Sequence, residues 1–279
     1  ILDGQWSSPA AGVLGGVPQV IFGGGDGWVY SFRADAGKDG QPELLWKFDA
    51  NPKESKWILG GAGTRNNIIA TPVIYDGLVY AAVGEDPASG DGIGHLWCID
   101  PTRRGDVSPT LAVRADDHSQ ILPHRRIQAV IPEQGEAAIP NPHTAAVWDY
   151  CQVDQNGDGH IDFEEEMHRC LGRVAIKNEL LFVADFGGLM HCLDAKSGKV
   201  HWTHDLMAHA WGSPLIVEDH VYVGDEDGDI CVFKLSGEKH DPVSEINMGG
   251  SVYTTPIVAN GVLFIASRTH LFAIQATDP

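Results

Sequence analysis

Two stretches of the chain nearly repeat each other: residues 173–202 read RVAIKNELLFVADFGGLMHCLDAKSGKVHW, and residues 213–241 read SPLIVEDHVYVGDEDGDICVFKLSGEKHD. Each contains short apolar runs separated by a polar turn and by an acidic, glycine-rich turn. Such runs are too short for helices and have the length of β-strands. Gly188 and Gly228 occupy the same place in the two copies, 40 residues apart. A repeat of about 40 residues with three or four strands is typical of one blade of a β-propeller.

The same unit can be followed on both sides of these two copies. Two further units precede them, with strands expected at residues 19–22, 28–32, 44–48, 73–75, 78–83 and 95–100, and a fifth unit follows, with strands expected at residues 261–266 and 271–274. A Ser-Pro or Thr-Pro pair opens four of the five units, and proline at the first residue of a strand removes no ladder hydrogen bond. We therefore predict an all-β fold, a β-propeller of four-stranded antiparallel blades. About five blades are visible, in residues 1–102 and 172–279, as part of a ring of seven or eight.

Residues 103–171 interrupt this pattern and are predicted to be an inserted loop region. Five prolines lie between positions 109 and 142, which disfavours regular structure there. His118, His124 and His143 are scattered through the insertion with a spacing that matches no metal site. A solvated loop is the expectation for them.

The composition limits the classes of partner. The chain has 38 Asp and Glu against 19 Lys and Arg, a net charge of −19, which argues against nucleic acid and anionic membrane surfaces. No apolar run approaches the roughly 18 residues that a membrane span requires. The chain begins at Ile1 in what reads as the approach to a strand, so the absence of a signal peptide says little about compartment.

One motif predicts a metal site. Residues 154–165, DQNGDGHIDFEE, fit the twelve-residue calcium loop of an EF-hand, and we call this segment the calcium loop. The expected ligands are the side chains of Asp154, Asn156, Asp158 and Glu165, the carbonyl of His160, and Asp162 directly or through water. Gly159 stands at the sharp turn. The following segment FEEEMHRCL can form a short exit helix, whereas the preceding segment AAVWDYCQV has the pattern of a strand. The sequence therefore predicts one structural calcium loop inserted in the propeller rather than a paired sensor.

The five cysteines form no CxxC motif. Cys98 and Cys192 occupy the same place in two repeats and are interpreted as small core residues. Cys151 and Cys170 flank the calcium loop, and two interpretations of them stay open: a disulfide in an oxidising compartment, or two buried thiols.

A second group of residues is a candidate ligand pocket at the starts of the blades. It combines aromatic side chains, two cations and an amide, with inter-blade packing and capping as the alternative: Trp57, Arg65, Asn66, His209, Trp211, Tyr253 and Arg268.

The segment LDAKSGKVHW (residues 193–202) resembles the tryptophan docking motif of quinoprotein propellers, and RADAGK…LLWKF (residues 33–48) is a looser copy. Further phrases point the same way: QWSSPA, PQVIFGGGDGWVYSF, GTRNNIIATPVIYDGLVY, GHLWCIDPTRRGDVSP and WGSPLI. Together they resemble the pyrroloquinoline-quinone-like repeat family, in particular its secreted planctomycete-type members. The resemblance implies a tryptophan that packs against the neighbouring blade, a periplasmic or secreted location, and further blades upstream or on another chain that close the ring.

The function expected from these observations is a calcium-binding propeller that acts as a binding or scaffold module for a protein or peptide partner. The alternative is a quinoprotein dehydrogenase whose cofactor site is completed outside this chain. The resemblance is compatible with pyrroloquinoline quinone, but its binding is not expected, because the vicinal cysteines and the cofactor-site Glu, Asn and Asp of those enzymes cannot be mapped onto the sequence. No catalytic residue can be named, and whether the chain is an enzyme stays open.

Overall fold

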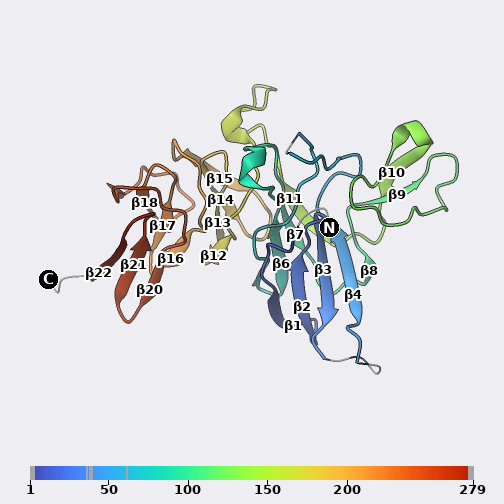
Figure 1. The fold of residues 1–279 in the computed structure, drawn as a ribbon, viewed down its shortest axis with the longest axis horizontal. Coiled ribbons are helices and arrows are strands. Elements are labelled where there is room, and N and C mark those ends of the chain that lie inside the picture. The colour runs from blue at the N-terminus through green and yellow to red at the C-terminus, as the bar shows by residue number, and fades with distance from the viewer. Residues whose placement is uncertain (1–3, 36, 38–39, 61, 276–279) are drawn as a thin grey trace. The chain divides into compact units, whose positions relative to one another are not determined.

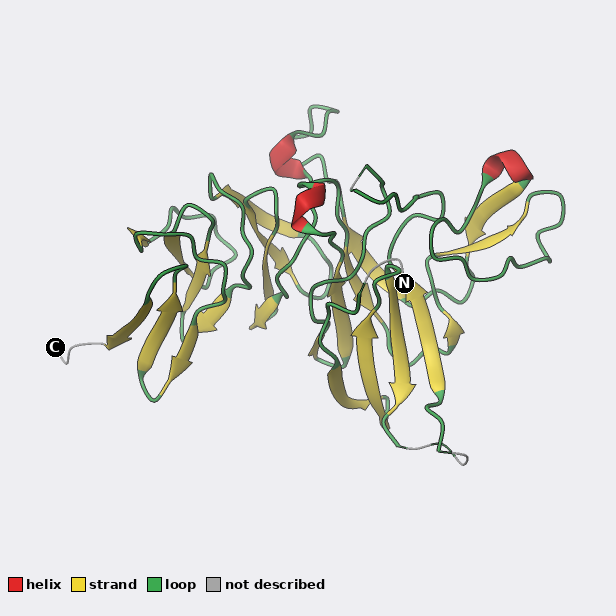
Figure 2. Ribbon diagram, in the orientation of Figure 1, coloured by secondary structure: helices red, strands yellow, loops and turns green. Residues whose placement is uncertain are grey.

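The computed structural model describes residues 4–35, 37, 40–60 and 62–275. Its regular structure is almost entirely β-strand (Figures 1 and 2), and the helices of the described residues are three single turns of 3-10 helix. The chain divides into two compact units, Ile1–Cys151 and Gln152–Pro279. The outer ends of the predicted blade segments, residues 1–3 and 276–279, lie outside the described residues.

The first blade forms most of the N-terminal half of the first unit. Four of its strands pair antiparallel in chain order, and a fifth short strand joins the outer edge in parallel. The strands are β1 (Ala10–Leu14), β2 (Val17–Gly23), β3 (Trp28–Arg33), β4 (Leu44–Asp49) and β8 (Gly105–Asp106). The three strands predicted in this blade are confirmed as the cores of β2, β3 and β4.

The second blade is completed by a strand from within the region predicted as an insertion. Its strands are β5 (Val73–Tyr75), β6 (Leu78–Ala82), β7 (Leu96–Ile99) and β11 (Ala146–Tyr150), in the order β11-β7-β6-β5, with the 3-10 turn η1 (Pro87–Ser89) in the β6–β7 loop. The segment predicted as the strand before the calcium loop is thus the outer strand of this blade. The inserted region 103–171 begins between the third and fourth strands of the blade and ends beyond it.

The insertion contains more regular structure than the solvated loop that its prolines suggested. It forms a hairpin of β9 (Thr110–Arg114) and β10 (Glu136–Pro140), with the 3-10 turn η2 (Pro132–Gln134) just before β10. His118, His124 and His143 are exposed as expected, and the His124 ring also lies against Trp28 with 4.7 Å between centroids.

The second unit contains three blades, preceded by the 3-10 turn η3 (Phe163–Glu165). Their strands are β12 (Ala175–Lys177), β13 (Leu180–Ala184), β14 (Leu189–Asp194) and β15 (Val200–Asp205); β16 (Leu215–Val217), β17 (His220–Gly224), β18 (Asp229–Lys234) and β19 (Ser244–Asn247); and β20 (Ile257–Ala259), β21 (Val262–Ala266) and β22 (Leu271–Gln275). All pairs within these sheets are antiparallel in chain order. The predicted all-β propeller, with about five blades in this chain, is confirmed.

The Ser-Pro and Thr-Pro pairs join one blade to the next. The backbone N–H of Arg173 donates to Ser213 Oγ at 2.9 Å, and the N–H of Ser213 donates to Thr255 Oγ1 at 2.8 Å. In these blades the proline stands immediately before the first strand. The hydroxyl of the residue before the proline accepts a hydrogen bond from the backbone at the start of the preceding blade. The repeated pair therefore aligns the starts of neighbouring blades and also begins the first strand of its own blade.

Trp202 behaves as the docking motif predicts. Its side chain is 4% exposed, its ring lies 5.6 Å from that of Phe233 in the next blade, and its Nε1–H donates to the carbonyl of Ser236 at 3.0 Å. An indole buried in this way contributes apolar area and still satisfies its donor. It fixes the blade of β12–β15 to the blade of β16–β19.

The acidic, glycine-rich turns are hairpin turns, as expected. In the β17–β18 turn, Asp225 Oδ1 accepts hydrogen bonds from the N–H groups of Gly228 and Asp229, both at 2.9 Å. Gly228 has φ +97°, and an added Cβ would lie 2.7 Å from the backbone oxygen of Gly250. Only glycine satisfies both the backbone angle and the close approach of the next segment.

None of the helices described here has the length and apolar character needed to cross a membrane.

Candidate functional site

The calcium loop folds around its own side-chain oxygens. The carboxylate of Asp154 accepts hydrogen bonds from the N–H groups of Gly157 at 2.6 Å and Gly159 at 2.9 Å. Asn156 Oδ1 accepts from the N–H of Asp158 at 2.8 Å. Gly157 and Gly159 have φ +76° and +84°, which lets the chain reverse tightly. The side chains of Asp154 and Asn156 therefore cap the turn, Asp158 Oδ1 accepts from the N–H of His160 at 2.7 Å, and all three residues are exposed.

Glu165 closes the loop from its far end. It lies in η3, is 6% exposed, and its Oε1 accepts from the N–H groups of Gln155 at 2.8 Å and Asn156 at 3.0 Å. Its Oε2 accepts from the N–H of Asp162 at 3.2 Å. The carboxylate is thus centred on the loop, with backbone amides as its partners.

The donor set fits a hard cation, although the loop is not folded as a finished metal site. All the predicted ligand atoms are oxygens, the type that Ca²⁺ prefers. Within the described ranges, no three His, Cys, Asp or Glu side chains form a group that could hold a metal ion. Calcium would therefore have to replace the amide hydrogen bonds of Glu165. The exit helix predicted after the loop is reduced to the single turn η3.

A buried His–Asp–His cluster fixes the segment that leaves the loop. Asp185 Oδ2 accepts from the backbone N–H of His168 at 2.9 Å and contacts His168 Nδ1 at 3.1 Å and His191 Nε2 at 2.9 Å. Asp185 Oδ1 accepts from the N–H of Leu189 at 3.0 Å. Asp185 and His191 are fully buried, and His168 is 4% exposed. Burial alone would raise the pKa of Asp185, but hydrogen bonds and charge from the two histidines outweigh it and lower that pKa.

The cluster links the loop to the blade through Phe163, whose ring lies 4.2 Å from that of His168. Sequence reasoning assigned Asp185 to a hairpin turn and gave the two histidines no role. His168 and Asp185 are 17 residues apart, so no local pattern in the sequence indicated their contact.

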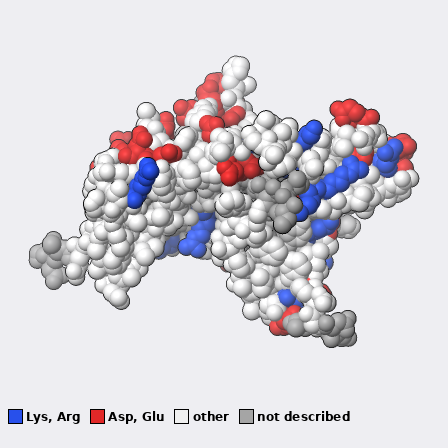
Figure 3. All heavy atoms as spheres, in the orientation of Figure 1, with Lys and Arg blue, Asp and Glu red and all other residues white. Residues whose placement is uncertain are grey.

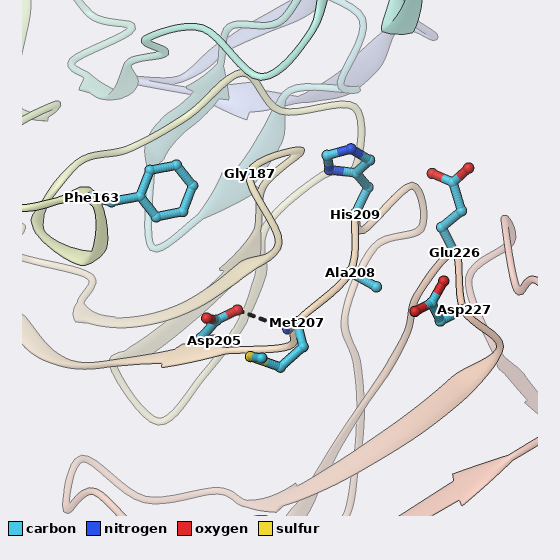
Figure 4. A pocket seen from close by; sticks show the side chains of 8 residues that line it. All are labelled: Phe163, Gly187, Asp205, Met207, Ala208, His209, Glu226 and Asp227. Atoms are coloured by element: carbon cyan, nitrogen blue, oxygen red, sulfur yellow. Dashed lines mark hydrogen bonds between the residues drawn. The ribbon is translucent and has the colours of Figure 1, made fainter.

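A cavity of about 460 Å³ lies beside this exit segment. It is lined by Phe163, Gly187, Asp205, Met207, Ala208, His209, Glu226 and Asp227, shown in Figure 4. Asp205 accepts a hydrogen bond from the backbone N–H of Met207 at 2.7 Å, which holds Met207 at φ +64° with its side chain 83% exposed. The cavity therefore presents exposed apolar side chains among three carboxylates.

An aromatic row continues from the cavity across successive blades. Phe186 stacks on His209 with 4.4 Å between centroids and meets Trp211 edge-on at 5.4 Å. Trp211 in turn meets Tyr253 edge-on at 4.9 Å, and its Nε1–H donates to Glu226 at 3.0 Å. The predicted residues His209, Trp211 and Tyr253 are thus brought together.

The other pocket candidates do not join this row. Arg268 is exposed, and its described contact is a backbone hydrogen bond to Ser251. Trp57 is half-buried in the first unit. Arg65 is 1% exposed and pairs with Asp49 at 2.7 Å, while Asn66 is 2% exposed and donates to the carbonyl of Ile93 at 2.9 Å. For Arg65 and Asn66 the packing alternative is the right one, and neither is a surface group of a pocket.

The cysteines are core residues where their position can be judged. Cys98 and Cys192 are fully buried free thiols, as predicted from their matching positions. Cys170 is also a free buried thiol, and its Sγ contacts the carbonyl oxygens of Gly172 at 3.0 Å and Ala184 at 3.3 Å. The bridge to Cys151 is therefore not formed in this structure.

Comparison with known proteins points to one family. The curated outer membrane protein assembly factor BamB of Moranella endobia is 28% identical over 144 residues, which is 47% of this chain and 35% of that protein. Among solved structures, BamB from Moraxella catarrhalis superposes with a TM-score of 0.55 at 16% identity, over 97% of this chain and 58% of its own. The C-terminal WD40 domain of Sif2 superposes equally well at 12% identity, over 92% of this chain and 54% of its own.

At these identities the solved structures show the propeller fold alone, and this chain spans roughly a third to three fifths of the length of these relatives. The family model described as outer membrane protein assembly factor BamB matches residues 138–278. Because that match covers half of the chain, the protein belongs to the BamB family of PQQ-like β-propeller repeats.

Proposed function

We propose that this chain is a calcium-stabilised propeller segment that binds a protein partner as a scaffold in the periplasm or outside the cell. Its relatives are named outer membrane protein assembly factors, which supports a role in protein assembly. Because the chain spans only part of those relatives, further blades, upstream or on another chain, complete the ring in this proposal. The secreted, planctomycete-type character belongs to the same proposal.

The observation that carries the binding role is the cavity beside the calcium loop. Its exposed Met207 and half-exposed Phe163 offer apolar contact, while Asp205, Glu226 and Asp227 surround them with negative charge. A protein-binding surface typically has apolar anchors surrounded by a polar rim. The cavity favours a partner segment that carries basic and apolar side chains.

The calcium loop contributes to this surface through Phe163. Bound calcium would join Asp154, Asn156, Asp158 and Glu165 and relieve the repulsion between their carboxylates. Phe163 lies between two of the predicted ligands in sequence and packs on His168. Calcium therefore stabilises the wall of the cavity, and its role is structural rather than chemical.

Photocrosslinking in the organism that makes the protein tests this function. A photoreactive amino acid at Met207 is expected to trap one defined envelope protein, and chelation is expected to lower the yield. The same probe at Val13, which is 70% exposed in the first unit, is the matched control. Identical adducts at both positions, or none at Met207, would contradict the proposal.

A further inference from the structure

The first unit contains a groove of about 910 Å³ whose lining differs in charge from the cavity of the second unit. Its lining includes Lys56, Arg125, Arg126, Ile127, Ile131 and Glu133. Figure 3 shows Lys and Arg side chains gathered as a band beside the β9–β10 hairpin. The chain as a whole has a net charge of −19, whereas this groove brings three cations together.

The groove is built on paired backbone rather than on a loose loop. The N–H of Trp57 donates to the carbonyl of Ile127 at 2.8 Å, and the N–H of Val130 donates to the carbonyl of Lys53 at 3.0 Å. The two walls of the groove are therefore hydrogen-bonded to each other. A surface held in this way needs little ordering when a ligand binds.

Arg125 acts as a support for the groove. It makes two hydrogen bonds of 2.7 Å to Glu136, a carboxylate that also accepts from the N–H of Ile131 at 2.8 Å. A two-pronged arginine–carboxylate pair is among the strongest ionic contacts. This pair fixes the loop between the two residues, and its charge is neutralised.

Of the three cations that line the groove, Lys56 and Arg126 are available to contact a ligand. Lys56 is exposed and forms no ion pair with the residues that the structure describes. The Arg126 side chain is 46% exposed, and its Nε lies 3.8 Å from Asp26, too far for a strong pair. Both cations can therefore exchange solvent for a carboxylate on a partner.

The buried charges behind this wall are paired. Asp49 is fully buried and accepts from Arg65 at 2.7 Å and from Lys53 at 2.9 Å. Asp26, which is 9% exposed and lies 3.8 Å from Arg126, is a second buried carboxylate. The preference for an anionic ligand therefore rests on the exposed cations Lys56 and Arg126.

The groove also carries apolar side chains in contact with solvent. Ile127 lines the groove and is 46% exposed, and Ile131 lines it as a half-buried side chain. Cations beside exposed aliphatic side chains match a segment in which acidic and apolar residues alternate. A phosphate or a sugar would leave the aliphatic side chains without a partner.

We propose that this groove docks an extended acidic and apolar segment of a protein partner. The proposal rests on the binding role proposed above and adds a second contact surface of opposite charge preference. It lies outside residues 138–278, the part matched by the family model, so it is a feature of this chain rather than of that match.

Selection from a random peptide phage library on the whole chain tests the proposal. Peptides that bind at low ionic strength and elute with salt are expected to combine Asp or Glu with Leu or Ile. Their affinity is expected to fall about tenfold or more in Lys56→Glu, Arg126→Glu, and to fall measurably in Lys56→Glu alone. The control Lys199→Glu, Lys234→Glu changes the net charge equally on exposed residues of the second unit and is expected to leave binding intact.

Three results would overturn the inference. The selected peptides could be neutral or basic; both double variants could weaken binding equally; or phosphatidylglycerol vesicles rather than peptides could bind through Lys56 and Arg126. A chain that crosslinks through Met207 but selects no acidic peptide would leave the proposed function standing and refute this groove alone.

Discussion

The two aspartates at equivalent turns, Asp185 and Asp225, are expected to respond very differently to the same substitution. Asp185 accepts from backbone N–H groups and from two histidines, whereas Asp225 Oδ1 accepts from two backbone N–H groups. The pKa of Asp185 is lowered, while burial, reinforced by the charge of Asp229, raises the pKa of Asp225. The fold stabilises the carboxylate at one turn and opposes it at the other.

The magnitude follows from the partners that asparagine can keep. In Asp185→Asn the amide oxygen can satisfy Leu189 or His168, but the amide NH₂ then faces the remaining donors. Removing one member of a buried ionic cluster costs about 3–5 kcal/mol. Asp225→Asn keeps an oxygen for Gly228 and Asp229 and loses a charge that burial disfavours, so its cost is about 1 kcal/mol or less.

Urea unfolding followed by tryptophan fluorescence measures both differences at neutral pH. The free energy of unfolding of Asp185→Asn is expected to be well below that of Asp225→Asn. Equal losses of stability in the two variants would refute the role given to the histidines.

The two variants also predict opposite dependences on pH. The folded-state pKa of Asp185 lies below its ordinary value of 3.8, so its contribution is complete above that value and is lost as the pH falls through the folded pKa. The difference in free energy of unfolding between wild type and Asp185→Asn should therefore shrink as the pH falls from about 5 to about 2. For Asp225 the folded pKa is raised, so stability falls as the pH rises through it, and Asp225→Asn gains on wild type over that range.

Further predictions concern the turns, the cofactor and the thiols. Gly188→Ala should cost about 1–3 kcal/mol more than Gly261→Ala in urea unfolding, because both have positive φ but only Gly188 has a backbone oxygen 2.7 Å from the added Cβ. The chain supplied with pyrroloquinoline quinone and Ca²⁺ should show no dye-linked oxidation of alcohols or sugars, and stoichiometric binding with turnover would promote the dehydrogenase alternative. Thiol titration in denaturant without reductant should find all five cysteines reactive, and two fewer would show a bridge between Cys151 and Cys170.

The blades were predictable from the repeat, because strands of three to seven residues between turns leave a period in the sequence. Residues 73–75 were predicted at the bounds that the structure shows. The pairing of β11 with β7 was not predictable in this way, because the β9–β10 hairpin and its flanking loops separate the two strands in the sequence. Nothing local indicates which strand a distant segment will join.

The site was predictable where its residues are contiguous and missed where they are not. The calcium loop was found because its ligand types follow one another at fixed spacing. Arg65 was a pocket candidate because it precedes a strand at a blade entry together with two amides, yet its side chain is 1% exposed and pairs with Asp49. The contact of His168 and His191 with Asp185 depends on tertiary packing, which composition and spacing do not encode.

Calorimetric titration of the chelated chain with calcium tests the central claim most directly. One ion should bind, and at about 100 times its dissociation constant it should stabilise the chain by about 2.7 kcal/mol. Binding should disappear in Asp154→Asn, Glu165→Gln and persist in Glu164→Gln, an exposed carboxylate of the same loop that is not a predicted ligand. An absence of heat up to millimolar calcium, or equal binding by both variants, would contradict a calcium-stabilised propeller.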